Sequence, residues 1–223
     1  NFNMMIMVIY ALITIAIFSM WYYARYEGNF LPSPKKTFNP MMLAAIVILV
    51  PGTQFAANFI ANLTGYIRPD WLQQYNELFE TSGITDTTFV TVLYSVILAP
   101  ICEELIFRGV TMRCARKALP FALANLMQAA LFGLFHLNWI QGIYAFALGI
   151  VLGYVCERGG SIYYSIGLHL LFNLWGTLSG FFPDPGNSVV IFVIVIAVTI
   201  VSLVVGFVLF NKGRRKLPIN STG

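Results

Sequence analysis

Long apolar stretches alternate with short polar ones along the whole chain. A membrane-spanning helix needs about 20 mostly apolar residues. Seven stretches meet or approach that length: residues 2–23, 41–63, 88–108 (continuing toward 116), 119–137, 140–156, 162–182 and 188–210. Between the second and third, Trp71, Tyr75, Leu78 and Phe79 recur near helical spacing, which predicts a short interfacial helix. The pattern predicts an all-α fold, a polytopic membrane helix bundle of about seven transmembrane helices.

Composition supports the same class. Hydrophobic residues make up 58% of the 223 residues and charged residues 10%, whereas soluble domains average about 25% charged residues. The chain is therefore predicted to be an integral membrane protein with the lipid bilayer as its first partner. Residues 1–23 lack a basic region and a small-residue cleavage site, so they are predicted to be a span and not a signal peptide. Cys102, Cys114 and Cys156 form no CxxC pair and predict neither a disulfide framework nor a zinc knuckle.

Charge is distributed unequally between the two sides of the predicted bundle. With seven spans, one side carries eleven of the thirteen basic residues: Arg25, Lys35, Lys36, Arg113, Arg116, Lys117, Arg158, Lys212, Arg214, Arg215 and Lys216. The other side carries Arg68, Asp70, Glu77, Glu80, Asp86 and Asp184. Basic loops remain in the cytoplasm, so the N-terminus is predicted outside and the C-terminus inside. The net charge of +4 then belongs to cytoplasmic loops and a solvated tail, and it implies no nucleic-acid partner.

All three charged residues that fall within a predicted span lie in the third, in the segment "APICEELIFRGV" (residues 99–110). Ionisable side chains at membrane depth are expensive and indicate a functional site. Glu104 and Arg108 are four residues apart, share a helix face and are expected to form an ion pair. Glu103 is rotated by about 100° and is expected to face elsewhere. Pro100 is expected to kink the helix just before the carboxylates.

Both histidines of the chain also fall in predicted spans. A helix rises about 1.5 Å per residue. Counted from the turn that joins their two spans, Glu103 and His136 differ in height across the membrane by about 8 Å. Asn173 matches Glu103 in height, and His169, four residues before it, lies about one turn lower. Glycines spaced four apart, Gly149 with Gly153 and Gly176 with Gly180, are expected to let the helices approach closely. Three helices are therefore able to present these polar side chains to one layer.

Three short motifs connect these residues to a known family. "EELIFR", "FGLFH" and "HLLFN" resemble the EExxxR, FxxxH and HxxxN motifs of the CPBP family, the CAAX-protease and bacteriocin-processing family of intramembrane proteases, related to Rce1-type prenyl-protein endopeptidases. The resemblance covers about residues 88–180. It implies that Glu103 is the general base that activates a water, which His136 holds and polarises. It also implies that His169 and Asn173 stabilise the oxyanion, while Glu104 and Arg108 are a supporting pair.

The resemblance implies an intramembrane endopeptidase of the glutamic type, without a cofactor. Its substrate would be a membrane-associated peptide or protein: a prenylated CAAX tail, a bacteriocin or signalling-peptide leader, or another membrane peptide. The brevity of the chain is typical of a protein of a prokaryotic cell membrane and favours peptide maturation, export or self-immunity over prenyl processing. Three regions are predicted. Residues 1–87 hold two spans and the interfacial segment, residues 88–182 form the catalytic core, and residues 183–223 form the last span and the basic tail.

Two other interpretations remain open. Glu103, His136 and His169 are a two-histidine-one-carboxylate set able to ligate zinc and leave a position for water. Against zinc, HExxH is absent, and no acid is spaced as a second-shell partner for either histidine. In a different class, the chain would be a membrane scaffold or regulator that binds a partner protein without cutting it. Buried charges argue against that role, because a scaffold does not need them.

Overall fold

The structure is a computed structural model that describes residues 2–25, 38–82, 88–179 and 188–214. These ranges are almost entirely helical. The α-helices are α1 (Phe2–Arg25), α3 (Pro40–Ile67), α4 (Pro69–Ser82), α5 (Phe89–Val92), α6 (Ala99–Glu104), α7 (Arg113–Ala115), α8 (Phe121–Phe135), α9 (Trp139–Gly159), α10 (Ile162–Ser179) and α11 (Val189–Gly213). Two π-helical segments, η1 (Leu93–Leu98) and η2 (Leu105–Met112), join α5, α6 and α7 into one continuous stretch.

Five helical stretches are long and apolar enough to cross a membrane: Met4–Tyr22, Pro40–Ile67, Phe89–Ala115, Trp139–Gly159 and Val189–Gly213. The predicted polytopic membrane bundle is confirmed. The other two predicted spans correspond to shorter helices, α8 with 15 residues and α10 with 18. The fourth predicted span, residues 119–137, is too long, because α8 begins after Pro120 and the chain turns at Leu137. Residues 180–182 of the sixth predicted span lie outside the described residues.

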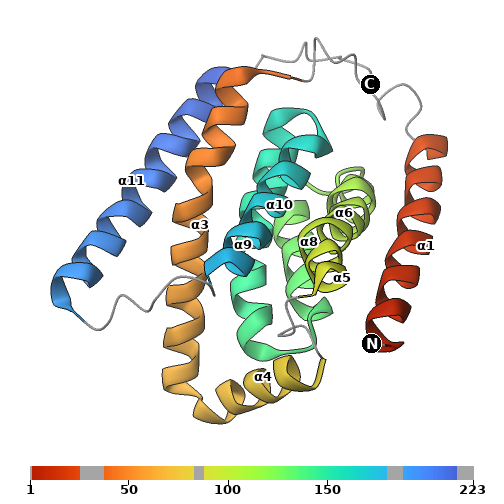
Figure 1. Cartoon of the computed structure of the whole chain (residues 1–223). Helices are drawn as coiled ribbons and strands as arrows, with labels where there is room; N and C mark the ends of the chain where they lie inside the picture. Colours follow the sequence, from red (N-terminus) through yellow and green to blue (C-terminus); the bar gives the residue numbers. More distant parts are fainter. Residues whose placement is uncertain (1, 26–37, 83–87, 180–187, 215–223) are drawn as a thin grey trace.

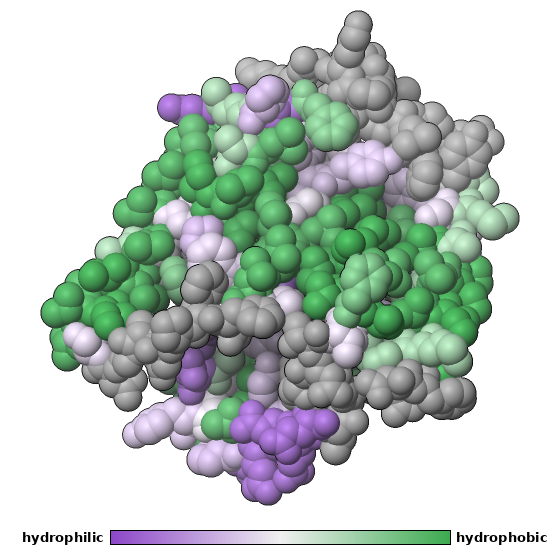
Figure 2. Space-filling view, viewed as in Figure 1, coloured by the Kyte–Doolittle hydropathy of each residue, from purple (hydrophilic) through white to green (hydrophobic). Residues whose placement is uncertain are grey.

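The helices form a bundle with α10 near its centre (Figure 1). α3 and α11 pack against each other on one flank and α1 lies on the opposite flank, beside η2 and α6. Leu49, Leu152, Leu168 and Phe172 contribute to the core between α3, α9 and α10. In Figure 2, hydrophobic residues cover much of the visible flank, and hydrophilic residues gather at the end where α4 lies. An apolar flank of this kind matches the hydrocarbon of a bilayer.

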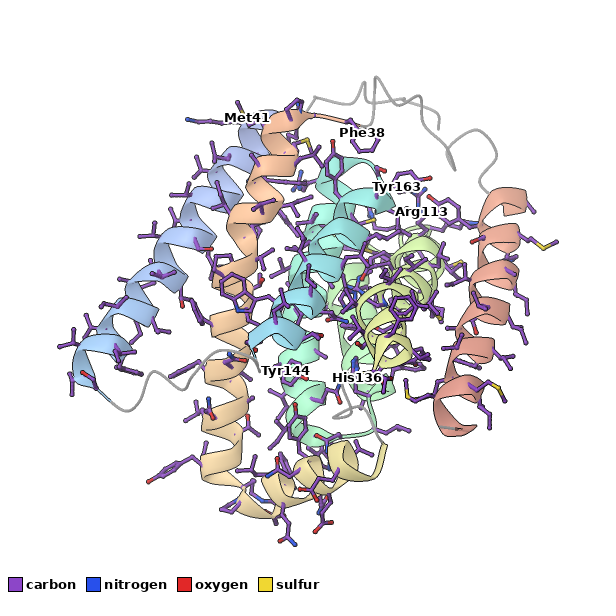
Figure 3. All side chains as sticks on the ribbon, in the orientation of Figure 1. Phe38, Met41, Arg113, His136, Tyr144 and Tyr163 are labelled. Atoms are coloured by element: carbon purple, nitrogen blue, oxygen red, sulfur yellow. The ribbon has the colours of Figure 1, made fainter. Side chains whose placement is uncertain are left out.

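The two ends of the bundle correspond to the two predicted sides. Figure 3 places Phe38, Met41, Arg113 and Tyr163 near one end, where the predicted basic loops would meet. α4, with its acidic residues, lies across the opposite end. The charge difference between the ends is therefore a property of the folded chain as well as of its sequence.

Aromatic contacts fasten α4 to α9. The ring of Trp71 stacks on Trp139, with centroids 5.4 Å apart and an interplanar angle of 21°. The hydroxyl of Tyr75 forms a hydrogen bond with that of Tyr144. The short helix predicted between the second and third spans is confirmed, although the side chain of Phe79 lies outside the described part. α4 thus covers the end of the bundle at which α9 begins.

A serine hydroxyl links α11 to α3. Ser202 Oγ accepts from the N–H of Gly52 at 2.9 Å and donates to the carbonyl of Ile48. A regular α-helix pairs these same two backbone groups with each other. Nearby, a Cβ at Gly206 would lie 2.6 Å from Cγ of Leu49, so the two helices are in close contact there. The last span is therefore held by hydrogen bonds as well as by packing.

Glycines allow α8 and α9 to pack closely, as predicted for Gly149 and Gly153. A Cβ at Gly149 would lie 3.1 Å from the Cα of Ala129. A closer approach occurs at Gly133, where a Cβ would lie 2.5 Å from the carbonyl oxygen of Gly142. Backbone atoms surround Gly133 on that side, so a side chain there has no flexible neighbour to displace.

We expect Gly133→Ala to destabilise the protein by about 1–3 kcal/mol, because α8 and α9 must separate to admit the methyl group. Gly167→Ala is the matched control, since no atom outside its local backbone lies within 4 Å of that Cβ position. That substitution should be neutral or stabilising by up to about 1 kcal/mol, because alanine favours the helix. Thermal melting of both variants in detergent measures the difference, and equal melting temperatures would contradict the packing of α8 on α9.

Candidate active site

Four helical elements bring the predicted site residues together. α6 carries Glu103 and Glu104, η2 carries Arg108, α10 carries His169 and Asn173, and His136 follows the last residue of α8. The two glutamates lie between η1 and η2, so the helix is π-helical immediately before and after α6. Segments of π-helix are rare and frequently occur at functional sites.

The predicted ion pair between Glu104 and Arg108 is present. Arg108 Nη1 donates to Glu104 Oε1 at 2.7 Å, and both side chains are completely buried. Arg108 Nη2 also donates to the carbonyl of Gly149, at 3.2 Å. The guanidinium carbon lies 4.5 Å from the centre of the Phe132 ring. Three helical elements thus enclose one arginine.

His169 lies between the two glutamates. Its Nδ1 is 2.9 Å from Glu104 Oε1, and its Nε2 is 3.6 Å from Glu103 Oε2. Because the two nitrogens lie on different edges of the ring, carboxylates that point in different directions both reach it. The prediction that neither histidine has an acidic second-shell partner is therefore wrong. Spacing along one helix did not reveal a partner on another helix.

These two contacts orient the imidazole of His169. Glu104 is paired with Arg108 and accepts from Nδ1–H of His169, which leaves Nε2 directed at Glu103. Glu103 is 16% exposed and His169 is 3% exposed, so Glu103 is the more accessible of the two.

His136 follows the last residue of α8, toward the end of the fourth predicted span. Its Nδ1 is 2.8 Å from the carbonyl oxygen of Phe132, so Nδ1 donates and Nε2 remains an acceptor. The next residue, Leu137, has a φ of 53°, in the left-handed region that a leucine rarely adopts. Backbone strain of this kind is concentrated at functional sites. The sequence showed the FxxxH spacing but not this turn.

The Phe132 ring connects His136 with the buried charges. Its centroid lies 4.9 Å from that of His136 and 5.8 Å from that of His169, with edge-to-face geometry in both cases. Arg108 lies over the same ring. The structure therefore brings Glu103, Glu104, Arg108 and His169 into direct contact, and His136 joins them through Phe132.

Asn173 is held by an irregularity in the third span. Its Nδ2 donates to the carbonyl of Ser95 at 2.8 Å. In η1, the N–H of Ala99 donates to the carbonyl of Tyr94, five residues earlier. The next amide in that register belongs to Pro100, which has no N–H to offer Ser95. The distortion predicted at Pro100 thus takes the form of a π-helical segment, and it leaves a carbonyl that Asn173 takes.

An apolar cavity of about 390 Å³ opens at the turn between α8 and α9. Gly133, Leu137, Trp139, Ile143 and Phe146 are among the residues that line it. A cavity of this size and polarity is typical of sites that bind apolar ligands.

The zinc alternative uses Glu103, His136 and His169. Glu103 and His169 are adjacent, and a carboxylate behind His169 is a partner that metal-ligating histidines commonly have. Across the described residues, however, no three His, Cys, Asp or Glu side chains form a group that could hold a metal ion.

Comparison with known families gives a match over residues 85–175. This segment matches the family described as Rce1-like, type II CAAX prenyl endopeptidase. The segment contains all six predicted site residues and agrees with the resemblance identified from the three motifs. No curated protein and no solved structure matches the chain.

Proposed function

We propose that this chain is a membrane protease that hydrolyses its peptide with a water activated by Glu103, because residues 85–175 match the Rce1-like family. One observation supports the assignment above the others. Glu103 is the partly exposed end of a buried chain of contacts that runs from Arg108 through Glu104 and His169. A base needs access to water, whereas the groups that orient it do not.

In the proposed reaction, Glu103 takes one proton from the water while Nε2 of His136 accepts a hydrogen bond from the other. The water oxygen forms a bond to the peptide carbon, and the carbonyl oxygen becomes an oxyanion. His169 and the Asn173 amide are assigned as donors to that oxyanion, and donors of this kind contribute about 10²–10³ each to the rate. When the C–N bond breaks, the proton on Glu103 passes to the leaving nitrogen.

The apolar cavity at the turn between α8 and α9 supports a substrate with an apolar tail. Three synthetic peptides would therefore test the substrate class. They are a peptide that ends in a farnesylated CAAX sequence, the same peptide without the farnesyl group, and a bacteriocin leader peptide. Mass spectrometry after incubation with the purified protein should show the two fragments of a single cut. Glu103→Ala should yield none. Binding of these peptides without cleavage by the wild type would favour a membrane scaffold over an enzyme.

We also propose that the reaction uses no metal. His169→Ala and Asn173→Ala should then behave alike, with turnover lowered about 10²–10³-fold and peptide binding largely retained. Under the zinc alternative the two variants diverge, because loss of His169 would remove a ligand and loss of Asn173 would not. Elemental analysis beside turnover separates the two. One equivalent of zinc that disappears in His169→Ala would overturn the proposal.

The proposed orientation has the N-terminus outside and the C-terminus in the cytoplasm of a prokaryotic cell. The separation of basic and acidic residues between the two ends supports it. Labelling of single cysteines placed in α4 and after α11 in intact cells tests this arrangement, because α4 should be the accessible end.

A further inference from the structure

A buried amide on α3 has a hydrogen-bonding atom with no partner among the described residues. Gln54 is 7% exposed, and its Oε1 receives no hydrogen bond from the part of the chain that the structure describes. Its Nε2 makes one long hydrogen bond, 3.3 Å to Asn58 Oδ1. Leaving a buried acceptor unpaired is unfavourable. An unpaired polar atom at such a position therefore points to a group that is supplied from outside the chain.

The side-chain amide of Gln54 lies next to Gly176 on α10, close to the candidate active site. An added Cβ at Gly176 would lie 3.8 Å from Gln54 Nε2 and 4.0 Å from Oε1, and these are the nearest atoms of other elements. Gly176 is exposed, and its predicted partner Gly180 lies outside the described residues. Gly176 follows Asn173 by three residues, so the two share a face of α10 and lie about 4.5 Å apart along its axis.

The distance suits an extended peptide. Such a chain advances about 3.3 Å per residue and presents a backbone N–H or C=O at each step. A substrate whose carbonyl lies at Asn173 would therefore bring an adjacent backbone amide near Gln54. The missing side chain at Gly176 leaves space for that backbone.

We propose that Gln54 is a substrate-binding residue, whose Oε1 accepts a backbone N–H of the peptide about one residue from the scissile bond. The proposal rests on the proposed function, because it needs a peptide substrate. Gln54 lies in the N-terminal region, outside the family match. The proposal therefore gives that region a part in binding the substrate.

Gln54→Met tests the proposal, because methionine keeps the size of the side chain and removes the acceptor. KM should rise about five- to tenfold, because the loss of one hydrogen bond weakens binding by about that factor. The kcat should stay within about twofold of the wild type. Thr53→Val is the matched control. Thr53 is the next buried polar residue on α3, but its hydroxyl already donates to the carbonyls of Leu49 and Val50. Its KM should not change.

Ester-containing peptides provide a second measurement that does not depend on how a variant folds. An ester replaces each backbone N–H of the cleaved peptide in turn, outside the scissile bond. The wild type should lose about five- to tenfold in kcat/KM at one position, and Gln54→Met should show no further loss there. If the wild type cleaves every ester peptide equally well, or Gln54→Met matches Thr53→Val, the inference fails and the proposed function stands. If the wild type cleaves no peptide, both fail.

Discussion

Glu103→Gln should lower peptide cleavage by about 10³-fold or more and leave the fold intact. Glutamine preserves the shape of the side chain and its contact with His169, but it cannot take a proton from water. General-base catalysis contributes about 10²–10⁴ to a rate, and the oxyanion donors act on a nucleophile that would no longer form. Turnover of a cleavable peptide, measured beside the melting temperature in detergent, gives both quantities.

Glu104→Gln is the matched control for that experiment. Its side-chain oxygen remains able to accept from His169 and Arg108, so measurable activity should remain. The comparison is direct because the two glutamates are adjacent and contact the same imidazole. A well-folded Glu104→Gln protein with no activity, beside an active Glu103→Gln protein, would show that the roles of the two glutamates are exchanged.

Arg108→Met should destabilise the protein by about 3–5 kcal/mol, because it leaves the carboxylate of Glu104 buried without its counter-ion. The effect should be large because both side chains are fully buried and the same guanidinium also binds the Gly149 carbonyl. Activity should fall as well, since the charge that holds Glu104 against His169 is lost. Denaturation in a detergent titration measures the free energy of unfolding.

Two controls separate the charge effect from the packing effect. Adding Glu104→Gln to Arg108→Met removes the stranded charge and should restore about half or more of the lost stability. Arg116→Met breaks an ion pair with Glu157 in which the side chains are 37% and 32% exposed. Such a pair is screened by solvent, and its loss should cost at most about 1 kcal/mol. If the double variant is as unstable as Arg108→Met, the arginine acts through packing and not through charge.

Much of this fold could be predicted because the bilayer restricts it strongly. Apolar length identified the helices, and the i,i+4 rule identified the pair of Glu104 and Arg108. Relative height brought the polar residues of three helices toward one layer, but it set His169 about one turn below Glu103, whereas His169 contacts both glutamates. All of these are properties of one helix or of its depth, and they do not depend on how neighbouring helices are rotated.

Rotation and helix type could not be read in the same way. The contact of His169 with both glutamates depends on the direction in which α10 faces α6, which no spacing within either helix determines. Each π-helical segment adds a residue to its turns. Counting at 3.6 residues per turn therefore does not predict which face of the third span a given side chain occupies. The position of His136 depends on the left-handed backbone conformation of Leu137. Leucine rarely adopts that conformation, so the sequence does not predict it.

Pro100 sets a limit on how this protein could be engineered. Replacing a proline inside a helix with alanine is an ordinary route to greater thermal stability, because alanine restores an amide and favours helix. Here the restored amide would compete with Asn173 for the carbonyl of Ser95. A more regular and more heat-resistant helix would thus free Asn173 from the Ser95 carbonyl. A substitution that raises thermal stability at Pro100 would therefore lower activity, although Pro100 takes no part in the chemistry.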